Sequence, residues 1–127
     1  MTSLSVLIVD SSAETREVLR MALAPSGAEI LEASRAEQGL ELARRRHPSV
    51  IVLDMEIDSA ASEPIARGFT VESDKHQTPM VLLGSARKLR RTFPAGQFVA
   101  KPYHYGPLVH RIEGLLREAR QPHKHSA

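Results

Sequence analysis

Cysteine and tryptophan are absent from this chain of 127 residues, and aromatic residues make up only 4% of it. Without cysteine the chain has no disulfide scaffold, no thiolate metal site and no cysteine nucleophile. Long apolar runs are also lacking, since the longest fall far short of the roughly 20 residues that a membrane-spanning helix needs. The N-terminal sequence MTSLSVLIVD has no basic region before its apolar run. We therefore interpret it as a first strand and not as a signal peptide.

The composition is that of one ordinary globular domain. Hydrophobic residues make up 42% of the chain and charged residues 25%, which is typical of a soluble protein with a core of its own. We predict a single domain over residues 1–120, followed by a tail or the start of a linker over residues 121–127. The lack of cysteine fits a reducing compartment, so we expect a cytoplasmic location.

Charge is divided unevenly between the two parts of the chain. Residues 1–83 carry 13 acidic and 8 basic side chains, whereas residues 84–127 carry 2 acidic and 9 basic ones. Such a basic region can bind an acidic partner or nucleic acid. No aromatic residues alternate with the basic ones, as binding of single strands favours. We therefore favour a solvated helix surface with a basic tail and do not expect direct contact with nucleic acid.

Short apolar runs alternate with helical patterns along the whole sequence. This alternation predicts an α/β fold with a parallel sheet and helices on both faces. The expected strands are residues 4–9, 30–31, 50–53, 80–83 and 98–100.

Several helix ends carry local signals. Ser11 with Glu14 and Ser34 with Glu37 have the spacing of capping boxes, and Pro107 is expected to open the last helix. The segment 55–78 is harder to interpret, but a helix capped by Ser62 is expected there. Residues 86–93 predict a short basic helix.

Polar residues stand at the ends of four predicted strands. Asp10, Asp54, the pair Gly84-Ser85 and Lys101 each follow an apolar run. If the strands are parallel, these residues meet at the carboxyl edge of the sheet, where open α/β folds bind ligands. Two carboxylates and a lysine suit phosphate and metal chemistry. No glycine-rich phosphate loop follows the first strand, so a flavodoxin-like enzyme or nucleotide binder is the least favoured function.

This order of elements and these strand-end residues resemble the receiver domain of bacterial response regulators. The resemblance covers residues 4–119, and its landmarks are VLIVD followed by a helix with Arg16, VIVLDM, TPMVLL and AKPY. It implies a flavodoxin-like (βα)5 three-layer sandwich with a five-stranded sheet in the order 2-1-3-4-5. It also implies a role in two-component, phosphorelay signal transduction, with no enzymatic activity beyond self-catalysed phosphoryl transfer and autodephosphorylation.

The resemblance also implies a role for each residue of the site. Asp54 accepts a phosphoryl group from a histidine kinase or phosphotransfer protein, and Lys101 pairs first with Asp54 and then with the phosphoryl group. The cofactor is Mg²⁺, held by Asp10, Asp54 and the backbone carbonyl of Glu56. The Glu56 side chain either turns toward the metal or pairs with Lys101.

Some positions depart from the usual pattern of these domains. Ser11 stands where a second acid is usual, which predicts weak binding of Mg²⁺. Gly84 stands where a hydroxyl usually closes over the phosphoryl group, although Ser85 follows it. Phe98 occupies the position of an aromatic residue that rotates inward on activation, or it packs in the core. The segment between Gly84 and Lys101 is shorter than usual.

Two functions therefore remain open. The first is a phosphorylatable receiver, favoured by Asp10, Asp54 and Lys101. The alternative is a pseudo-receiver, a protein-interaction module without a phosphoryl switch. In either case residues 84–116 are the expected surface for an output domain or a homodimer. The six histidines show no spacing with acidic residues that indicates a metal site, and His123 and His125 are expected to be solvent-exposed.

Overall fold

The computed structural model of the protein describes residues 3–57, 60, 62–85 and 97–120. Five parallel strands form one sheet in the order β2-β1-β3-β4-β5, which confirms the predicted α/β fold and strand order. The strands are β1 (Ser5–Val9), β2 (Glu29–Ala33), β3 (Val50–Asp54), β4 (Met80–Gly84) and β5 (Gln97–Ala100). The helices are α1 (Ala13–Leu23), α2 (Ala36–Arg46), α3 (Glu63–His76) and α5 (Tyr105–Arg120), with a 3₁₀ turn η1 (Ala24–Ser26).

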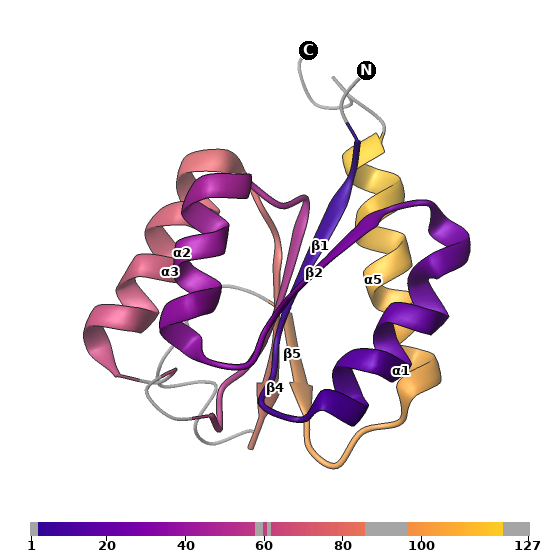
Figure 1. Ribbon diagram of the computed structural model, residues 1–127, viewed down its shortest axis with the longest axis horizontal. Helices are drawn as coiled ribbons and strands as arrows, with labels where there is room; N and C mark the ends of the chain where they lie inside the picture. Colours follow the sequence, from indigo (N-terminus) through magenta and orange to yellow (C-terminus); the bar gives the residue numbers. More distant parts are fainter. Residues whose placement is uncertain (1–2, 58–59, 61, 86–96, 121–127) are drawn as a thin grey trace.

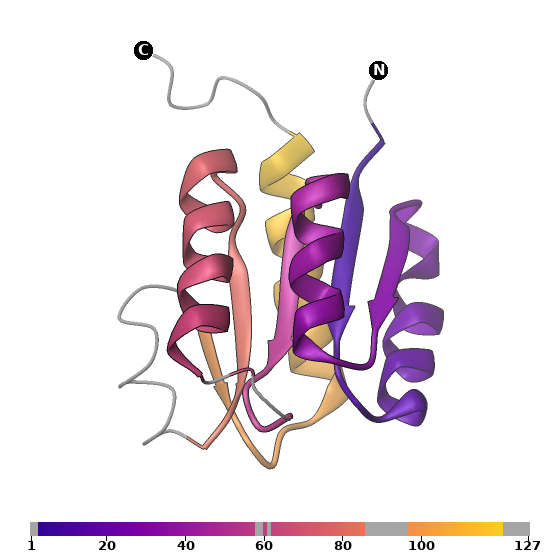
Figure 2. The same cartoon turned by 60° about the vertical axis from the view of Figure 1, so that its left-hand side comes forward.

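Helices cover both faces of the sheet (Figures 1 and 2). Helices α2 and α3 lie on one face, and α1 and α5, the first and last helices, lie on the other. Successive residues of a strand point to opposite faces. In β1, Leu7 and Val9 therefore join the core beneath α2 and α3, whereas Val6 and Ile8 join the core beneath α1 and α5.

The continuous apolar runs of the sequence are the strands in the middle of the sheet. All five residues of each of β1, β3 and β4 are buried. A strand covered by helices on both faces has no solvent-facing side, so it needs no alternation of polar and apolar residues. The edge strands β2 and β5 are less buried.

The helix starts differ from the predicted ones in three places. Ser12, not Ser11, caps α1, because its Oγ accepts a hydrogen bond from the Thr15 amide at 3.1 Å. Helix α2 starts after Arg35 and has no side-chain cap. Helix α5 begins at Tyr105, two residues before Pro107.

Other predictions about the elements have mixed outcomes. Helix α3 does begin after Ser62, with Pro64 in its first turn, but the side chain of Ser62 makes no capping hydrogen bond. Strand β2 is five residues long rather than two. The predicted basic helix over residues 86–93 and the tail over residues 121–127 lie outside the described residues. In the described part of the chain, no helix is both long and apolar enough to cross a membrane.

Candidate functional site

Asp10, Asp54 and Lys101 come together at the carboxyl edge of the sheet, at the lower end of the strands in Figure 1. Asp10 follows β1 directly, and Asp54 is the last residue of β3. Both are buried, with 4% and 5% of their surface exposed. Nζ of Lys101 donates a hydrogen bond to Oδ1 of Asp54 at 2.9 Å. The pattern of strand ends therefore pointed to side chains that do meet in space.

The two aspartates are held by the same local arrangement. Oδ1 of Asp10 accepts a hydrogen bond from the amide of Ser12, and Oδ1 of Asp54 accepts one from the amide of Glu56, both at 2.9 Å. An aspartate that binds the amide two residues later forms an Asx turn, which leads the chain away from the strand. Among the described residues, no hydrogen bond goes to Oδ2 of either aspartate. Within the described residues, Oδ2 of each carboxylate is therefore open to another group.

Lys101 is fixed both by its backbone and by its side chain. Its amide donates to the carbonyl of Gly84 at 3.0 Å, which extends the pairing of β5 with β4. Its Nζ lies 3.6 Å from Oε1 of Glu56 in addition to its contact with Asp54. Of the two alternatives for the Glu56 side chain, the structure has the pairing with Lys101. The second oxygen of Glu56 accepts a hydrogen bond from the amide of Ser85 at 3.2 Å.

Burial and neighbouring charges shift the pKa of two groups in the site. Burial raises the pKa of Asp10; the hydrogen bond from Ser12 opposes this, and the charge of Asp54 adds to it. Burial by itself lowers the pKa of Lys101, but the hydrogen bond to Asp54 and the neighbouring carboxylates outweigh it and raise that pKa. The lysine is therefore a cation held beside three acids.

Tyr103 borders the site and is also perturbed. Burial, with smaller effects from the charges of Asp10, Tyr105 and Asp54, raises its pKa to about 12. Its ring meets that of Tyr105 edge to face, with the ring centres 5.8 Å apart. The Tyr105 hydroxyl lies 3.2 Å from Oγ1 of Thr15 in α1. These contacts connect the segment after Lys101 to α1, the helix that follows Asp10.

The remaining predicted site residues are placed as follows. Ser11 is exposed, next to Asp10 and outside the helix cap. Gly84 is buried at the end of β4, and the exposed Ser85 follows it. Phe98 in β5 is partly buried against the core beneath α2 and α3. Its position fits core packing, and its rotation on activation stays a prediction.

A second group of ionisable residues was missed by the sequence interpretation. His47, Glu72 and His76 lie close together, with one ligand atom of each within 4.8 Å of the others. The statement that no histidine shows metal-ligand spacing with an acid is therefore wrong. Glu72 and His76 are four residues apart in α3, a spacing that places both on one helix face. This spacing was the available signal, but the contribution of His47 required the fold.

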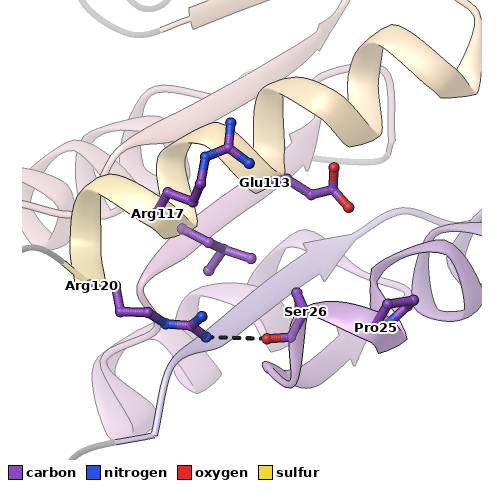
Figure 3. A pocket seen from close by; sticks show the side chains of 6 residues that line it. Pro25, Ser26, Glu113, Arg117 and Arg120 are labelled. Carbon is purple, nitrogen blue, oxygen red and sulfur yellow. Dashed lines mark hydrogen bonds between the residues drawn. The ribbon is translucent and has the colours of Figure 1, made fainter.

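A pocket of about 230 Å³ lies between η1 and the end of α5 (Figure 3). It is lined by Pro25, Ser26, Glu113, Leu116, Arg117 and Arg120. A guanidinium nitrogen of Arg120 donates to the carbonyl of Ser26 at 3.1 Å across it. The lining is mainly apolar carbon, and its charged side chains are those of Glu113, Arg117 and Arg120. We assign it no part in the site.

The chain is similar in sequence to curated transcriptional regulators. The chain is 30% identical over 116 residues to "Probable transcriptional regulator ycf27" of Porphyra purpurea, covering 90% of this chain and 48% of that protein. It is 27% identical over 122 residues to the phosphate regulon transcriptional regulatory protein PhoB of Pseudomonas aeruginosa, covering 92% and 53%. The chain thus spans about half the length of the curated relatives that it matches. No family model matches it.

Solved structures resemble the chain in fold. A response regulator receiver modulated diguanylate cyclase from Pelobacter carbinolicus has a TM-score of 0.71 and 24% identity, covering 92% of this chain and 95% of that one. A CheY-like response regulator receiver domain protein from Methanospirillum hungatei has a TM-score of 0.75 and 17% identity, covering 94% and 98%. At these identities the likeness concerns the fold alone.

Proposed function

The chain resembles response regulator receiver domains in sequence and in fold, and from this premise we propose that Asp54 accepts a phosphoryl group in a two-component phosphorelay. The observation that carries the proposal is the contact of 2.9 Å between Asp54 and Lys101, with the buried Asp10 directly after the neighbouring strand β1. A lysine that holds the acceptor carboxylate is in position to hold the transferred group as well. The phosphoryl donor is a histidine kinase or a histidine phosphotransfer protein.

The transfer is a displacement at phosphorus. An oxygen of Asp54 forms a bond to the phosphorus atom while the bond from phosphorus to the donor nitrogen breaks, and the electron pair of that bond stays on the donor. Oδ2 of Asp54 is suited to attack, because among the described residues its partner Oδ1 receives the hydrogen bonds from Glu56 and Lys101. Lys101 then faces the negative phosphoryl oxygens, whose charge it partly neutralises.

The donor set at this edge fits Mg²⁺. Hard oxygen ligands suit this ion, and it commonly binds through one or two carboxylates together with phosphate oxygens. Asp10, Asp54 and the backbone carbonyl of Glu56 would hold it. Burial, with a smaller effect from the charge of Asp54, raises the pKa of Asp10, and a cation beside it would favour its ionised form. When bound, the ion supplies positive charge that offsets the charge gathered on the acids and the phosphoryl oxygens. Ser11 contributes no charge, so we expect the affinity for Mg²⁺ to be low.

Intact mass after incubation with acetyl phosphate and Mg²⁺ tests the proposal. The wild-type chain is expected to gain one phosphoryl group, and Asp54→Asn to gain none. Asp74→Asn, which changes an exposed aspartate of α3, is the matched control and is expected to behave as wild type. A phosphoryl group on Asp54→Asn would contradict the assignment of the acceptor.

The role of Mg²⁺ has a separate test. Ser11→Asp adds a carboxylate next to Asp10 on the exposed side of the site, so it is expected to lower the dissociation constant for Mg²⁺ by about tenfold or more. Isothermal titration of both proteins measures this change. Equal affinities would mean that the position of Ser11 does not contribute to the metal site.

A pseudo-receiver is the second candidate function, and Gly84 is the observation that favours it. Gly84 offers no hydroxyl to the phosphoryl group, and Ser85 is exposed beyond it. In that case residues 84–116 act as a standing surface for an output domain or a second copy of the chain. A folded wild-type protein that gains no mass with acetyl phosphate would support this alternative. A cytoplasmic location belongs to either version of the proposal, because the lack of cysteine fits a reducing compartment.

A further inference from the structure

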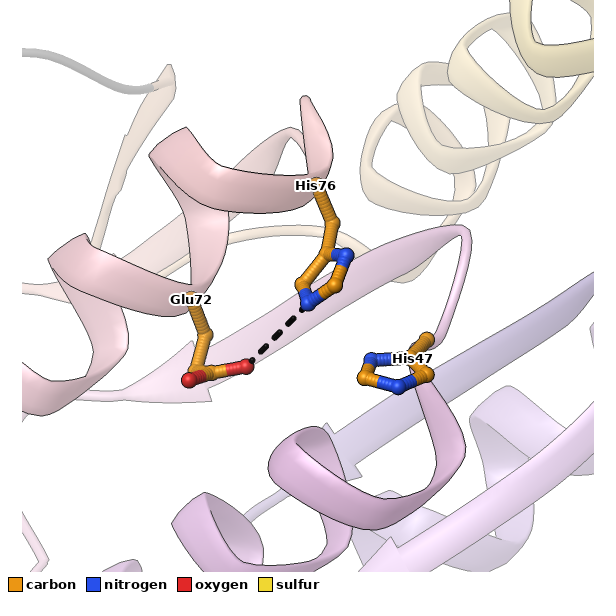
Figure 4. Close-up of side chains that lie close together, drawn as sticks. All are labelled: His47, Glu72 and His76. Atoms are coloured by element: carbon orange, nitrogen blue, oxygen red, sulfur yellow. Dashed lines mark ion pairs between the residues drawn. The ribbon is translucent and has the colours of Figure 1, made fainter.

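His47, Glu72 and His76 form a cluster of two imidazoles and one carboxylate (Figure 4). The cluster lies at the amino ends of β3 and β4, whereas Asp54 lies at the carboxyl end of β3. His47 follows α2 and precedes β3, while Glu72 and His76 belong to the last turns of α3, ahead of β4. Nε2 of His76 lies 3.6 Å from Oε1 of Glu72. The rings of His47 and His76 have their centres 4.1 Å apart. Figure 4 shows all three side chains turned toward one another.

The fold brings these residues together for identifiable reasons. Glu72 and His76 share a face of α3 because they are four residues apart. His47 has the left-handed backbone conformation, with φ of 47°, and its amide donates to the carbonyl of Ala43. This conformation ends α2 and turns the imidazole toward α3. The two helices also approach closely, since Gly68 of α3 faces the side chain of Leu40 in α2.

Glu72 is a largely buried carboxylate that forms an ion pair with His76. Only 9% of its surface is exposed, and buried carboxylates normally accept good hydrogen bonds. Among the described residues, its one polar partner is His76, at a distance longer than a hydrogen bond. Two imidazoles in contact are also unfavourable when both carry a proton, because like charges then meet. A cation held by all three side chains satisfies each of them.

We propose that His47, Glu72 and His76 bind one divalent transition-metal ion of the zinc type. Two imidazole nitrogens and a carboxylate oxygen form a donor set that Zn²⁺ commonly takes, with a fourth position left for water. Zinc–ligand distances of about 2.0–2.2 Å require ligand atoms closer together than 4.8 Å, so the side chains close in by small rotations. Imidazole ligands favour such ions over Mg²⁺, which prefers oxygen. This site is therefore chemically distinct from the carboxyl edge.

The position of the site implies a structural effect. The metal would join the end of α2 to the end of α3, two helices that otherwise meet through apolar contacts on the same face of the sheet. An ion that binds the folded chain and not the unfolded one raises stability by mass action. The free energy of unfolding should therefore rise with the concentration of Zn²⁺.

The test is isothermal titration of the full chain with Zn²⁺, together with thermal unfolding at several Zn²⁺ concentrations. We expect about one equivalent bound at this site and an unfolding temperature that rises with Zn²⁺ but not with Mg²⁺. His47→Asn and His76→Gln are each expected to weaken binding by more than about tenfold. Asparagine tolerates the left-handed conformation of position 47, and circular dichroism of each variant without metal checks its fold.

Controls separate this cluster from other histidines of the chain. His110→Asn changes an exposed imidazole of α5 and is expected to leave Zn²⁺ affinity unchanged. The pair of substitutions His123→Gln and His125→Gln removes the histidines near the C-terminus and is also expected to retain the site. Undiminished binding in His47→Asn and His76→Gln, or loss of binding only in the His123 and His125 variant, would overturn the proposal. Glu72→Gln, which keeps the shape of the side chain, is expected to bind more weakly than wild type.

Discussion

The ionised side chain of Asp10 lowers the free energy of unfolding. Its pKa is raised, chiefly by burial, so the native state keeps the proton at pH values where the unfolded chain has released it. The free energy of unfolding therefore falls as the pH rises above the ordinary value of 3.8, and the penalty persists at neutral pH. We predict that Asp10→Asn is more stable than wild type at pH 7 in EDTA and that the difference vanishes in acid. Urea unfolding at both pH values measures it, and equal midpoints at pH 7 would contradict it.

Tyr103 gives a second prediction about acidity. With a pKa of about 12 against an ordinary value of 10.0, its phenol stays protonated in the native state while that of the unfolded chain ionises. Stability therefore decreases as the pH rises from about 10 to about 12. The chain has two tyrosines and no tryptophan, so tyrosinate absorbance reports on these two groups alone. The step near pH 12 should disappear in Tyr103→Phe; its persistence in that variant would refute the assignment.

Individual residues were predictable where their place depends on the strand ends alone. Asp10, Asp54 and Lys101 follow apolar runs, and parallel strands bring their ends to one edge, so no side-chain detail was needed. His47 depends instead on a left-handed turn and on two helices lying side by side, which a pattern along the chain does not encode. Only the spacing of Glu72 and His76 was visible beforehand.

At the scale of elements, two glycines in helices should respond to substitution in opposite ways. A Cβ on Gly39 of α2 would lie 2.6 and 2.9 Å from the two methyl groups of Val9, a rigid buried residue of β1. A Cβ on Gly114 of α5 would meet nothing closer than Arg117 at 3.7 Å. We predict that Gly39→Ala lowers the free energy of unfolding by about 1–3 kcal/mol. Gly114→Ala should raise it by about 0.5–1 kcal/mol, because alanine is the better helix former.

Urea unfolding of the two variants and wild type checks this pair. Gly114→Ala serves as the control for the effect of alanine in a helix as such. If Gly39→Ala proves as stable as wild type, the contact between α2 and β1 is looser than the distances indicate.

Elements were easier to predict than their ends. The middle strands are buried on both faces and have apolar runs that indicate them directly. The start of α1 was placed one residue early, because Ser11 and Ser12 both offer a hydroxyl. In the structure the amide of Ser12 donates to Asp10, and the hydroxyl of Ser12 accepts the hydrogen bond that caps α1. The strand order came from the resemblance to receiver domains and not from the apolar pattern.

At the scale of the whole molecule, we ask how strongly the proposed phosphorylation of Asp54 would change the conformation of residues 84–116. A ligand shifts an equilibrium only by its different affinity for the two states, and Gly84 removes one contact that would distinguish them. We predict small NMR shifts across residues 84–116 when the free domain is compared with the domain treated with beryllofluoride, which stands in for the phosphoryl group. Large shifts there, with a change of dimerisation, would show a working switch.

The covering of one sheet face by the first and last helices has a consequence for synthesis on the ribosome. Leu19 and Leu23 of α1 share their core with Leu108, Ile112 and Leu115 of α5. The face beneath α2 and α3 is supplied mainly by residues up to Leu82, so most of it can pack while translation continues. The other face keeps its apolar side chains open until the end of the domain has left the exit tunnel. During that interval the apolar face that α1 and α5 later cover is exposed on the nascent chain, where chaperones can bind it.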